Sequence, residues 1–147
     1  MSQLIVCQEN VQRYYGDKPE MLEKYRKIVE SGKCPFCAPN IENVLVGQTQ
    51  YWNVVENPFP YKNACVHLLL LPKRHVVFLA QSNREEWSDM PLAIDLAICK
   101  RPALAHGGGL ALREKQVGGV TLYHLHWHLI APAFGDDGQI PVNFGIG

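Results

Sequence analysis

The stretch His124-Leu125-His126-Trp127-His128-Leu129-Ile130 contains three histidines at every second position of an apolar segment. Successive side chains of a β-strand face opposite sides, so the three imidazoles are expected to share one face of a strand. Imidazole is a base, a nucleophile, a proton carrier and a metal ligand near neutral pH. Three buried histidines on one face would leave several ring nitrogens to satisfy, which disfavours a purely structural role. We therefore expect this strand to carry out chemistry.

Two chemical interpretations of the histidine pattern are open at this point. In the first, the histidines bind a catalytic metal from one strand, as paired strand histidines do in zinc hydrolases. In the second, one histidine is a covalent nucleophile, and its neighbours hold that ring and the substrate. The pattern alone does not divide the roles among the three rings.

Length and composition favour a single globular domain. The 147 residues suffice for one hydrophobic core, and 47% hydrophobic and 19% charged residues are ordinary contents for such a domain. Lys plus Arg equals Asp plus Glu at 14 each. Because no global basic field attracts polyanions, we expect no strong binding to nucleic acid or to anionic membranes.

The sequence predicts a cytoplasmic protein without a membrane anchor. The apolar runs 68–71 and 76–80 are far shorter than a membrane-spanning helix requires. Residues 1–6 lack a basic region followed by a long apolar one, so we expect no signal peptide. An odd number of cysteines without a framework pattern favours a reducing compartment. The cysteines are Cys7, Cys34, Cys37, Cys65 and Cys99.

The N-terminal part predicts one helix followed by a tight turn. Residues 17–31 place apolar side chains at helical period, with Asp17 as the cap, Pro19 in the first turn and Gly32 after the end. The turn Cys34-Pro35-Phe36-Cys37 follows.

Strands and a second helix are expected in the remainder of the chain. The expected strands are 43–46, 51–55, 66–71, 109–113 and 121–131, and a loop with Gly118-Gly119 joins the last two. Ser82 and Glu85 resemble a capping box that opens the second helix, and Pro91 is expected to kink or restart it. The order helix, strands, helix, strands indicates an α+β domain built on an antiparallel sheet.

The pair Cys34-x-x-Cys37 has the spacing of one half of a tetrahedral zinc site. A thioredoxin-like redox pair would open a helix after a strand, whereas this pair follows a helix. Two unrelated buried cysteines are the alternative. A zinc site needs two more ligands, and His75 and the three clustered histidines are the natural suppliers.

The segment Gly118-Gly119-Val120-Thr121 comes shortly before the histidines. Glycines allow close approach of the backbone to an anion, and free N–H groups with a hydroxyl can bind phosphate oxygens. An ordinary hairpin loop would have the same composition. His67, at the start of a buried strand, is either a hydrogen-bonded core residue or a support for the site.

Three motifs together resemble the histidine triad (HIT) family. The stretch 124–130 resembles the family signature, His67-Leu-Leu-Leu-Leu-Pro-Lys-Arg-His75 resembles its upstream strand, and Cys34-Pro-Phe-Cys37 is similar to the Cys-x-x-Cys of zinc-containing members. They follow the family's order. The resemblance implies a HIT-like α+β fold, with an antiparallel sheet, a long helix packed on it and an additional N-terminal helix.

The resemblance also implies how one domain of 147 residues is divided. Residues 1–33 would be an N-terminal helical extension, residues 34–132 the HIT core, and residues 133–147 an irregular C-terminal tail. A homodimer is implied as well.

The activity that the resemblance implies is nucleotide hydrolysis or nucleotidyl transfer at the α-phosphate. His126 is then the nucleophile, which attacks phosphorus and forms a nucleotidyl-histidine intermediate. A hydrogen bond from its other nitrogen to a backbone carbonyl would fix the neutral tautomer. His128 would contact phosphate oxygens and help to protonate the leaving group. The substrate would be a nucleoside phosphoramidate, a dinucleoside polyphosphate, or a nucleotidylated metabolite or protein.

The resemblance further implies ligands for a metal and for the nucleotide. A closed, structural Zn2+ site would consist of Cys34, Cys37, His75 and His124. The nucleotide and its phosphate would contact Gly119, Thr121, Arg113, Asn57 and His67.

Two positions depart from the family pattern. Many members have glutamine where this chain has Val120, and asparagine near the position of Arg113. Val120 offers no side-chain hydrogen bond to a leaving group, whereas Arg113 can add a charge-assisted phosphate contact. Two alternatives to this enzyme remain open. One is a metal-dependent hydrolase that uses the triad as ligands, and the other, suggested by Val120, is a nucleotide-binding module without turnover.

Overall fold

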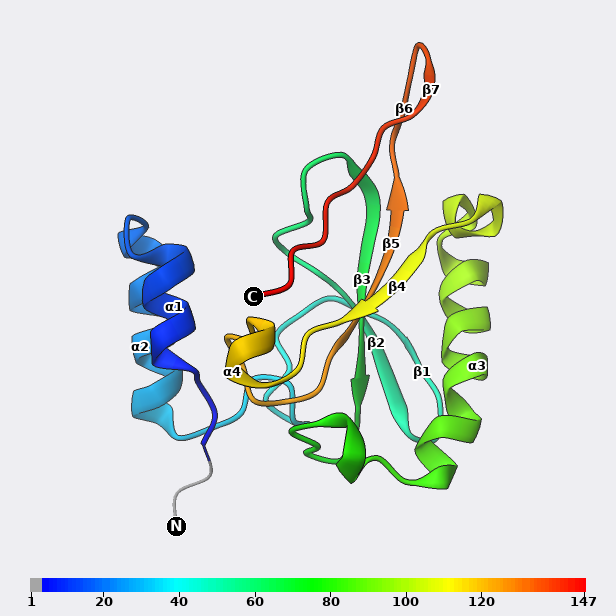
Figure 1. Ribbon diagram of the computed structural model, residues 1–147. Helices are drawn as coiled ribbons and strands as arrows, with labels where there is room; N and C mark the ends of the chain where they lie inside the picture. Colours follow the sequence, from blue (N-terminus) through cyan, green and yellow to red (C-terminus); the bar gives the residue numbers. More distant parts are fainter. Residues whose placement is uncertain (1–3) are drawn as a thin grey trace.

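The computed structural model describes residues 4–147 and has a five-stranded antiparallel sheet at its centre (Figure 1). The strand order is β1-β2-β3-β5-β4. The strands are β1 (Leu45–Gln48), β2 (Trp52–Glu56), β3 (Ala64–Pro72), β4 (Gly109–Leu112) and β5 (Trp127–Pro132). A separate two-stranded hairpin consists of β6 (Phe134–Gly135) and β7 (Gly138–Gln139). The α+β class and the antiparallel sheet are confirmed.

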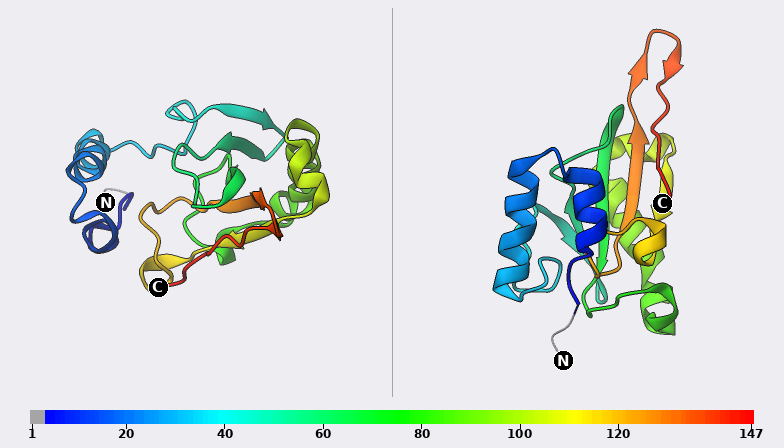
Figure 2. Two further views of the ribbon diagram at one scale, coloured as in Figure 1. Left: turned by 90° about the horizontal axis from the view of Figure 1, so that it is seen from above. Right: turned by 60° about the vertical axis from the view of Figure 1, so that its left-hand side comes forward.

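Helices cover both faces of the sheet, as Figures 1 and 2 show. The α-helices are α1 (Gln8–Tyr15), α2 (Pro19–Ser31), α3 (Arg84–Lys100) and α4 (Lys115–Gly118). Two short 3-10 helices span Leu79–Gln81 and Pro102–His106. The long helix α3 packs on one face, and the helical pair α1–α2 stands on the other side. No helix among residues 4–147 is long and apolar enough to cross a membrane.

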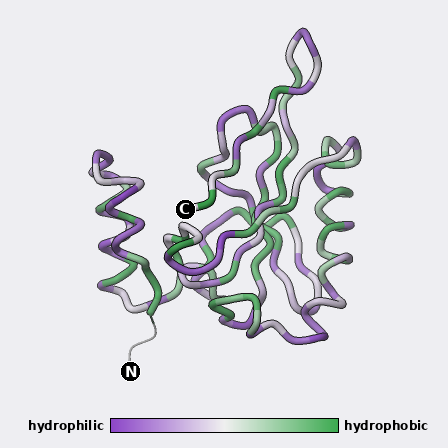
Figure 3. Tube along the Cα trace, in the orientation of Figure 1, coloured by the Kyte–Doolittle hydropathy of each residue, from purple (hydrophilic) through white to green (hydrophobic). Residues whose placement is uncertain are grey.

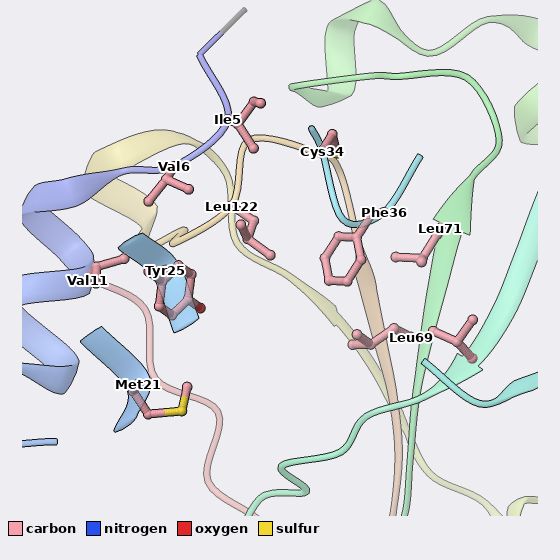
Figure 4. Close-up of a cluster of buried hydrophobic side chains, with 11 residues drawn as sticks. Ile5, Val6, Val11, Met21, Tyr25, Cys34, Phe36, Leu69, Leu71 and Leu122 are labelled. Carbon is pink, nitrogen blue, oxygen red and sulfur yellow. The ribbon is translucent and has the colours of Figure 1, made fainter. Parts of the chain in front are cut away.

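Two hydrophobic cores explain why β3 is a nearly continuous run of leucines. Leu68 and Leu70 face α3, whereas Leu69 and Leu71 face the helical pair (Figure 4). Because side chains alternate along a strand, a sheet that is buried on both faces needs apolar residues at successive positions. The outer turns, such as the tip of the β6–β7 hairpin, are hydrophilic (Figure 3). The face that packs on the helical pair is also the face that carries the histidines.

The boundaries of both predicted helices differ from the expectation. Lys18, not Asp17, precedes α2, and neither side chain caps it. The capping box of α3 is Asn83 with Glu86 instead of Ser82 with Glu85, since the side chain of Asn83 accepts from the backbone of Glu86 at 2.9 Å. Arg74 Nε also donates to the Glu86 carboxylate at 2.9 Å, which favours the start of α3 at this residue pair.

Of the kink or restart expected at Pro91, the restart was wrong, because α3 is continuous through this residue. Proline removes one backbone donor. Met90, Ala93 and Ala97 are buried against the sheet on both sides of the proline, and this packing holds the helix together.

The last predicted strand, 121–131, begins only at Trp127. The backbone before it pairs with segments outside the sheet: the N–H of Tyr123 donates to Ile5 at 2.7 Å, and the N–H of Leu125 donates to Val76 at 2.6 Å. These distant partners replace a neighbouring strand, and sequence periodicity does not reveal them. His124 and His126 therefore lie in an irregular segment and His128 in β5.

Three elements, besides the two 3-10 helices, were not predicted from the sequence. Helix α1 precedes the expected helix, the short α4 lies in the loop before Gly119, and the hairpin β6–β7 lies within the tail that was expected to be irregular. Helix α4 and strands β6 and β7 are too short to give a periodic signal in the sequence. Residues 1–3, at the end of the chain where no signal peptide is expected, are outside the described residues.

Candidate functional site

Four metal-binding atoms meet near the end of β3. The ligand atoms of Cys34, Cys37, His75 and His124 all lie within 4.8 Å of one another. His124 Nδ1 is 3.4 Å from Cys34 Sγ, 3.5 Å from Cys37 Sγ and 3.3 Å from His75 Nδ1. A tetrahedral zinc ion with usual bond lengths separates sulfur from nitrogen by about 3.6 Å and two nitrogens by about 3.3 Å. The predicted ligands therefore come together with a spacing that fits zinc.

The protonation states of these side chains suit a cation. His124 Nε2–H donates to the carbonyl of Pro72 at 2.9 Å, so Nδ1 carries the lone pair and faces the cysteines. Burial lowers the pKa of His124 to about 4 and also lowers the pKa of His75, so both rings are neutral at pH 7. Burial, with the adjacent Cys34, raises the pKa of Cys37 to about 12. Since the thiolate is the ligand form, the Cys37 thiol would ionise beside a bound cation.

His126 has one ring nitrogen bound to the backbone and one, Nε2, that bonds to no residue among 4–147. Its Nδ1–H donates to the carbonyl oxygen of His124 at 2.7 Å, which places the lone pair on Nε2. Burial, and to a lesser extent the charge of Arg113, lowers the pKa of His126. A neutral ring with a lone pair on the free nitrogen is the form that a nucleophilic histidine needs.

His67 and His128 form a directly hydrogen-bonded pair. The N–H of Tyr61 donates to His67 Nδ1 at 3.1 Å, so the ring proton of His67 lies on Nε2. That Nε2–H donates to His128 Nδ1 at 2.9 Å. The proton of neutral His128 is then on Nε2, which is buried and bonds to no other described residue. The pair thereby prepares His128 as an N–H donor.

Burial keeps both members of this pair uncharged at neutral pH. It lowers the pKa of His67 to about 4, with a smaller effect of Arg113. It lowers the pKa of His128 to about 2, with smaller effects of His126, His67 and Arg113. The neutral tautomers assigned from the hydrogen bonds are therefore the relevant ones.

Arg113 is held beside the histidines by the C-terminal segment. Its Nε donates to the carbonyl of Gly145 at 2.6 Å and its Nη1 to the hydroxyl of Tyr61 at 2.6 Å. The guanidinium carbon lies 3.9 Å from the centroid of the Phe144 ring. These contacts leave Nη2 available to an anion. Phe144 also contacts His128, with ring centroids 5.2 Å apart.

Gly119 and Thr121 lie in the segment that follows α4. Gly119 has a φ of 99°, and a Cβ there would come 2.7 Å from the Tyr14 hydroxyl, so the position requires glycine. The hydroxyl of Thr121 is 2.9 Å from that of Tyr25. The side chain of Val120 between them is buried.

One cleft of about 1180 Å3 brings most predicted site residues together between the helical pair and the sheet. It is lined, among others, by Asn57, Arg113, Gly119, Thr121, His126 and His128. His67 is not among the lining residues; it lies behind His128 and close to Asn57, whose Nδ2 is 3.2 Å from His67 Nε2. A direct contact of His67 with a ligand, as predicted, is therefore not favoured by this placement.

The fold and these motifs agree with a known domain. Residues 38–135 match the model of the HIT domain. The chain belongs to the HIT domain family. Two uncharacterised HIT-like proteins of Mycobacterium tuberculosis, from strains CDC 1551 / Oshkosh and H37Rv, are each 34% identical over 73 residues. That match covers 48% of this chain and 50% of each relative, so the chain spans about half the length of these relatives.

Solved structures of HIT proteins share the fold at low sequence identity. A HIT-like protein has a TM-score of 0.58 at 20% identity, over 77% of this chain and 98% of its own. A histidine triad nucleotide-binding protein from Candida albicans has a TM-score of 0.56 at 19% identity, over 84% of this chain and 83% of its own. A Zn-bound histidine triad family protein from Mycobacterium smegmatis has a TM-score of 0.52 at 18% identity, over 82% of this chain and 81% of its own. The HIT-like fold is therefore confirmed.

Several residues of the site escaped the sequence motifs. Tyr61 and Phe144 contact Arg113 and His128, and Tyr25 contacts Thr121. The only sequence signal was the aromatic character of the segment after Asn57, because the partners of these rings are distant along the chain.

Proposed function

We propose that the protein is a nucleotide hydrolase or nucleotidyltransferase that acts at the α-phosphate through a covalent intermediate on His126. The observation that carries the proposal is the hydrogen bond of 2.7 Å from His126 Nδ1 to the carbonyl of His124. This bond leaves a neutral Nε2 at the cleft and stabilises the positive charge that the ring acquires when Nε2 attacks.

In the first step, a bond forms between His126 Nε2 and phosphorus. The bond from phosphorus to the leaving group breaks, and the leaving group takes the electron pair. His128 Nε2–H and Arg113 Nη2 are the donors available to the phosphate oxygens and to the departing atom. The backbone at Gly119 and the hydroxyl of Thr121 provide further donors.

In the second step, the oxygen of water or of another acceptor attacks phosphorus and gives up its proton to solvent, while the bond from phosphorus to His126 Nε2 breaks. His126 Nε2 recovers its lone pair, and the nucleotide leaves as the monophosphate or as the transfer product. Two displacements thus replace one difficult displacement, and each has a lower barrier.

A zinc ion bound by Cys34, Cys37, His75 and His124 would have a structural role. It would connect the turn 34–37 to the segment after β3 and to the residue whose carbonyl orients His126. All four positions of a tetrahedral site would then be filled by protein atoms, which is typical of structural zinc.

Two proteins of the same fold support a nucleotide ligand and a zinc site. The Candida albicans structure is described as nucleotide-binding and the Mycobacterium smegmatis structure as Zn-bound, and both share this fold. We further propose that the substrate is a nucleotide, that the protein is a homodimer and that it is located in the cytoplasm.

The two alternative functions make different use of the triad. In a metal-dependent hydrolase, all three histidines would be ligands, yet within residues 4–147 only His124 groups with other metal-binding side chains. A binding module without turnover is favoured by Val120, which has no polar side chain for the leaving group. The experiment below separates the enzyme from both.

The test compares wild type with His126→Ala in a turnover assay. The panel contains nucleoside phosphoramidates, dinucleoside polyphosphates and nucleotidylated amino acids, each labelled at the α-phosphate. Wild type is expected to turn over at least one class and to carry acid-labile label on His126. His126→Ala is expected to lose activity and label while it keeps its zinc.

The exposed His106 provides a matched control, since His106→Ala should behave as wild type. Loss of metal in His126→Ala would favour the metal-dependent hydrolase. Nucleotide binding by wild type without turnover or label would favour the binding module.

A further inference from the structure

The helical pair α1–α2 precedes the region that matches the HIT domain, yet it contacts the segment with the proposed phosphate-binding residues. Asn10 of α1 is buried, and its side-chain amide donates to the carbonyls of Gln116 at 2.9 Å and Val120 at 2.7 Å. These carbonyls flank Gly118-Gly119. A buried amide with two loop carbonyls as acceptors restricts the loop to one conformation.

The backbone before α1 pairs with the same segment. The N–H of Cys7 donates to the carbonyl of Thr121 at 3.0 Å, and Val6 forms an antiparallel bridge with Leu122. The N-terminal pair is therefore fixed to the residues on both sides of Thr121. Side-chain packing of Val6, Val11 and Leu122 supports this contact (Figure 4).

Tyr25 of α2 contacts the one hydroxyl of this segment that lines the cleft. Its own hydroxyl lies 2.9 Å from Thr121 Oγ1, and its ring, which is 8% exposed, stacks on Tyr15 with centroids 5.7 Å apart. Either hydroxyl can donate in this contact, because each has one hydrogen and two lone pairs. With Tyr25 as the donor, Thr121 Oγ1 accepts and its own hydrogen is directed to another acceptor.

We propose that Tyr25 is a positioning residue of the phosphate site: it orients the hydroxyl of Thr121 so that this hydroxyl donates to a phosphate oxygen of the substrate. The helical pair is thereby a part of the active site and not only a cover. The inference rests on the proposed nucleotide function. It assigns to a residue outside the matched domain a role in recognising a nucleotide phosphate.

The test measures how much the phosphate contributes to binding. The probes are AMP and adenosine, or the monophosphate and nucleoside of whichever base wild type binds best. The variants are Tyr25→Phe, Thr121→Val, their combination and Thr121→Ser. Tyr51→Phe removes the hydroxyl of a tyrosine that precedes β2 and does not line the cleft, and it is the matched control. Calorimetry gives affinities, and kinetics give kcat and KM separately.

Tyr25→Phe is expected to weaken binding of the monophosphate by about threefold to tenfold, the usual effect of one hydrogen bond, and to leave the affinity for the nucleoside unchanged. Thr121→Val should give a similar loss, and the double variant no further loss. Thr121→Ser should restore binding, and Tyr51→Phe should resemble wild type.

Two results would overturn the inference while leaving the proposed function intact. In the first, Tyr25→Phe weakens monophosphate and nucleoside equally. In the second, the losses from Tyr25→Phe and Thr121→Val are additive. If wild type binds the monophosphate no better than the nucleoside and turns over no nucleotide, both the inference and the proposed function are wrong.

Discussion

His67 Nε2 lies 2.9 Å from His128 Nδ1, and this contact sets which nitrogen of His128 carries the proton. His67 itself receives a hydrogen bond from the backbone of Tyr61 at 3.1 Å, so its own tautomer is fixed. A residue that does not line the cleft thus determines the hydrogen-bonding state of one that does.

Replacing His67 should therefore reduce turnover without abolishing nucleotide binding. In His67→Leu, the apolar side chain fills the space but leaves His128 Nδ1 without its donor, so His128 can hold its proton on either nitrogen. We expect kcat to fall about tenfold to a hundredfold, and steady-state kinetics measure it. His106→Leu is the control, and unchanged kcat in His67→Leu would contradict the role of the pair.

The free energy of unfolding should decrease as the pH falls from about 6.5 toward about 4. Unfolded histidines bind protons near pH 6.5, whereas burial lowers the pKa of folded His67 to about 4. The unfolded chain binds more protons between these values, so acid favours it, by about 1.4 kcal/mol per pH unit for one such group.

Chemical denaturation at pH 7, 6 and 5 measures this dependence. His128, with a pKa lowered to about 2, contributes in the same direction. The slope should become shallower in His67→Leu, since one of the titrating groups is gone. Equal slopes in the two proteins would show that His67 is not buried in its neutral form.

Removing one zinc ligand should lower stability more than it changes chemistry. Cys34→Ser is expected to reduce zinc content and to cost several kcal/mol of folding free energy, because metal binding contributes directly to folding. Metal analysis and thermal unfolding measure both quantities. Cys99→Ser, at an exposed position, should keep zinc and stability. Full zinc content with unchanged stability in Cys34→Ser would exclude Cys34 as a ligand.

Arg113 should affect binding of the charged part of the substrate. Arg113→Ala is expected to raise KM about tenfold to a hundredfold, because it removes a charge-assisted contact and the hydrogen bond to Tyr61. Arg113→Lys should recover only part of the loss, since lysine lacks the planar arrangement of donors. Arg84→Ala, on the exposed first turn of α3, is the control. Identical KM values in all four proteins would exclude Arg113 from the site.

Local patterns in the sequence were sufficient for the fold class and for a half zinc site at Cys34 and Cys37, and the family resemblance added His75 and His124 as the further ligands. The alternation at 124–130 and the spacing of Cys34 and Cys37 depend on chemistry that recurs wherever such sites occur. The apolar run of residues 66–71 predicted a buried strand, and the structure shows that its leucines enter two separate cores.

Contacts between segments that are distant along the chain could not be predicted from these local patterns. The irregular path of residues 121–126 depends on partners at Ile5 and Val76, and Arg113 is placed by Gly145. Such pairings bring together residues that no period in the sequence connects, so only the folded chain shows them.

The sequence by itself predicted which side chains would carry chemistry, because residue types and their spacing limit the possible ligands and nucleophiles, and the family resemblance predicted how the triad would be divided. Only the tertiary structure shows the partner of each ring nitrogen. His124 faces the cysteines, His126 donates Nδ1–H to the carbonyl of His124, and His128 bonds to His67. The physical reason is that a histidine's role depends on which of its two nitrogens is bound, and the partner that binds it is fixed by packing in three dimensions.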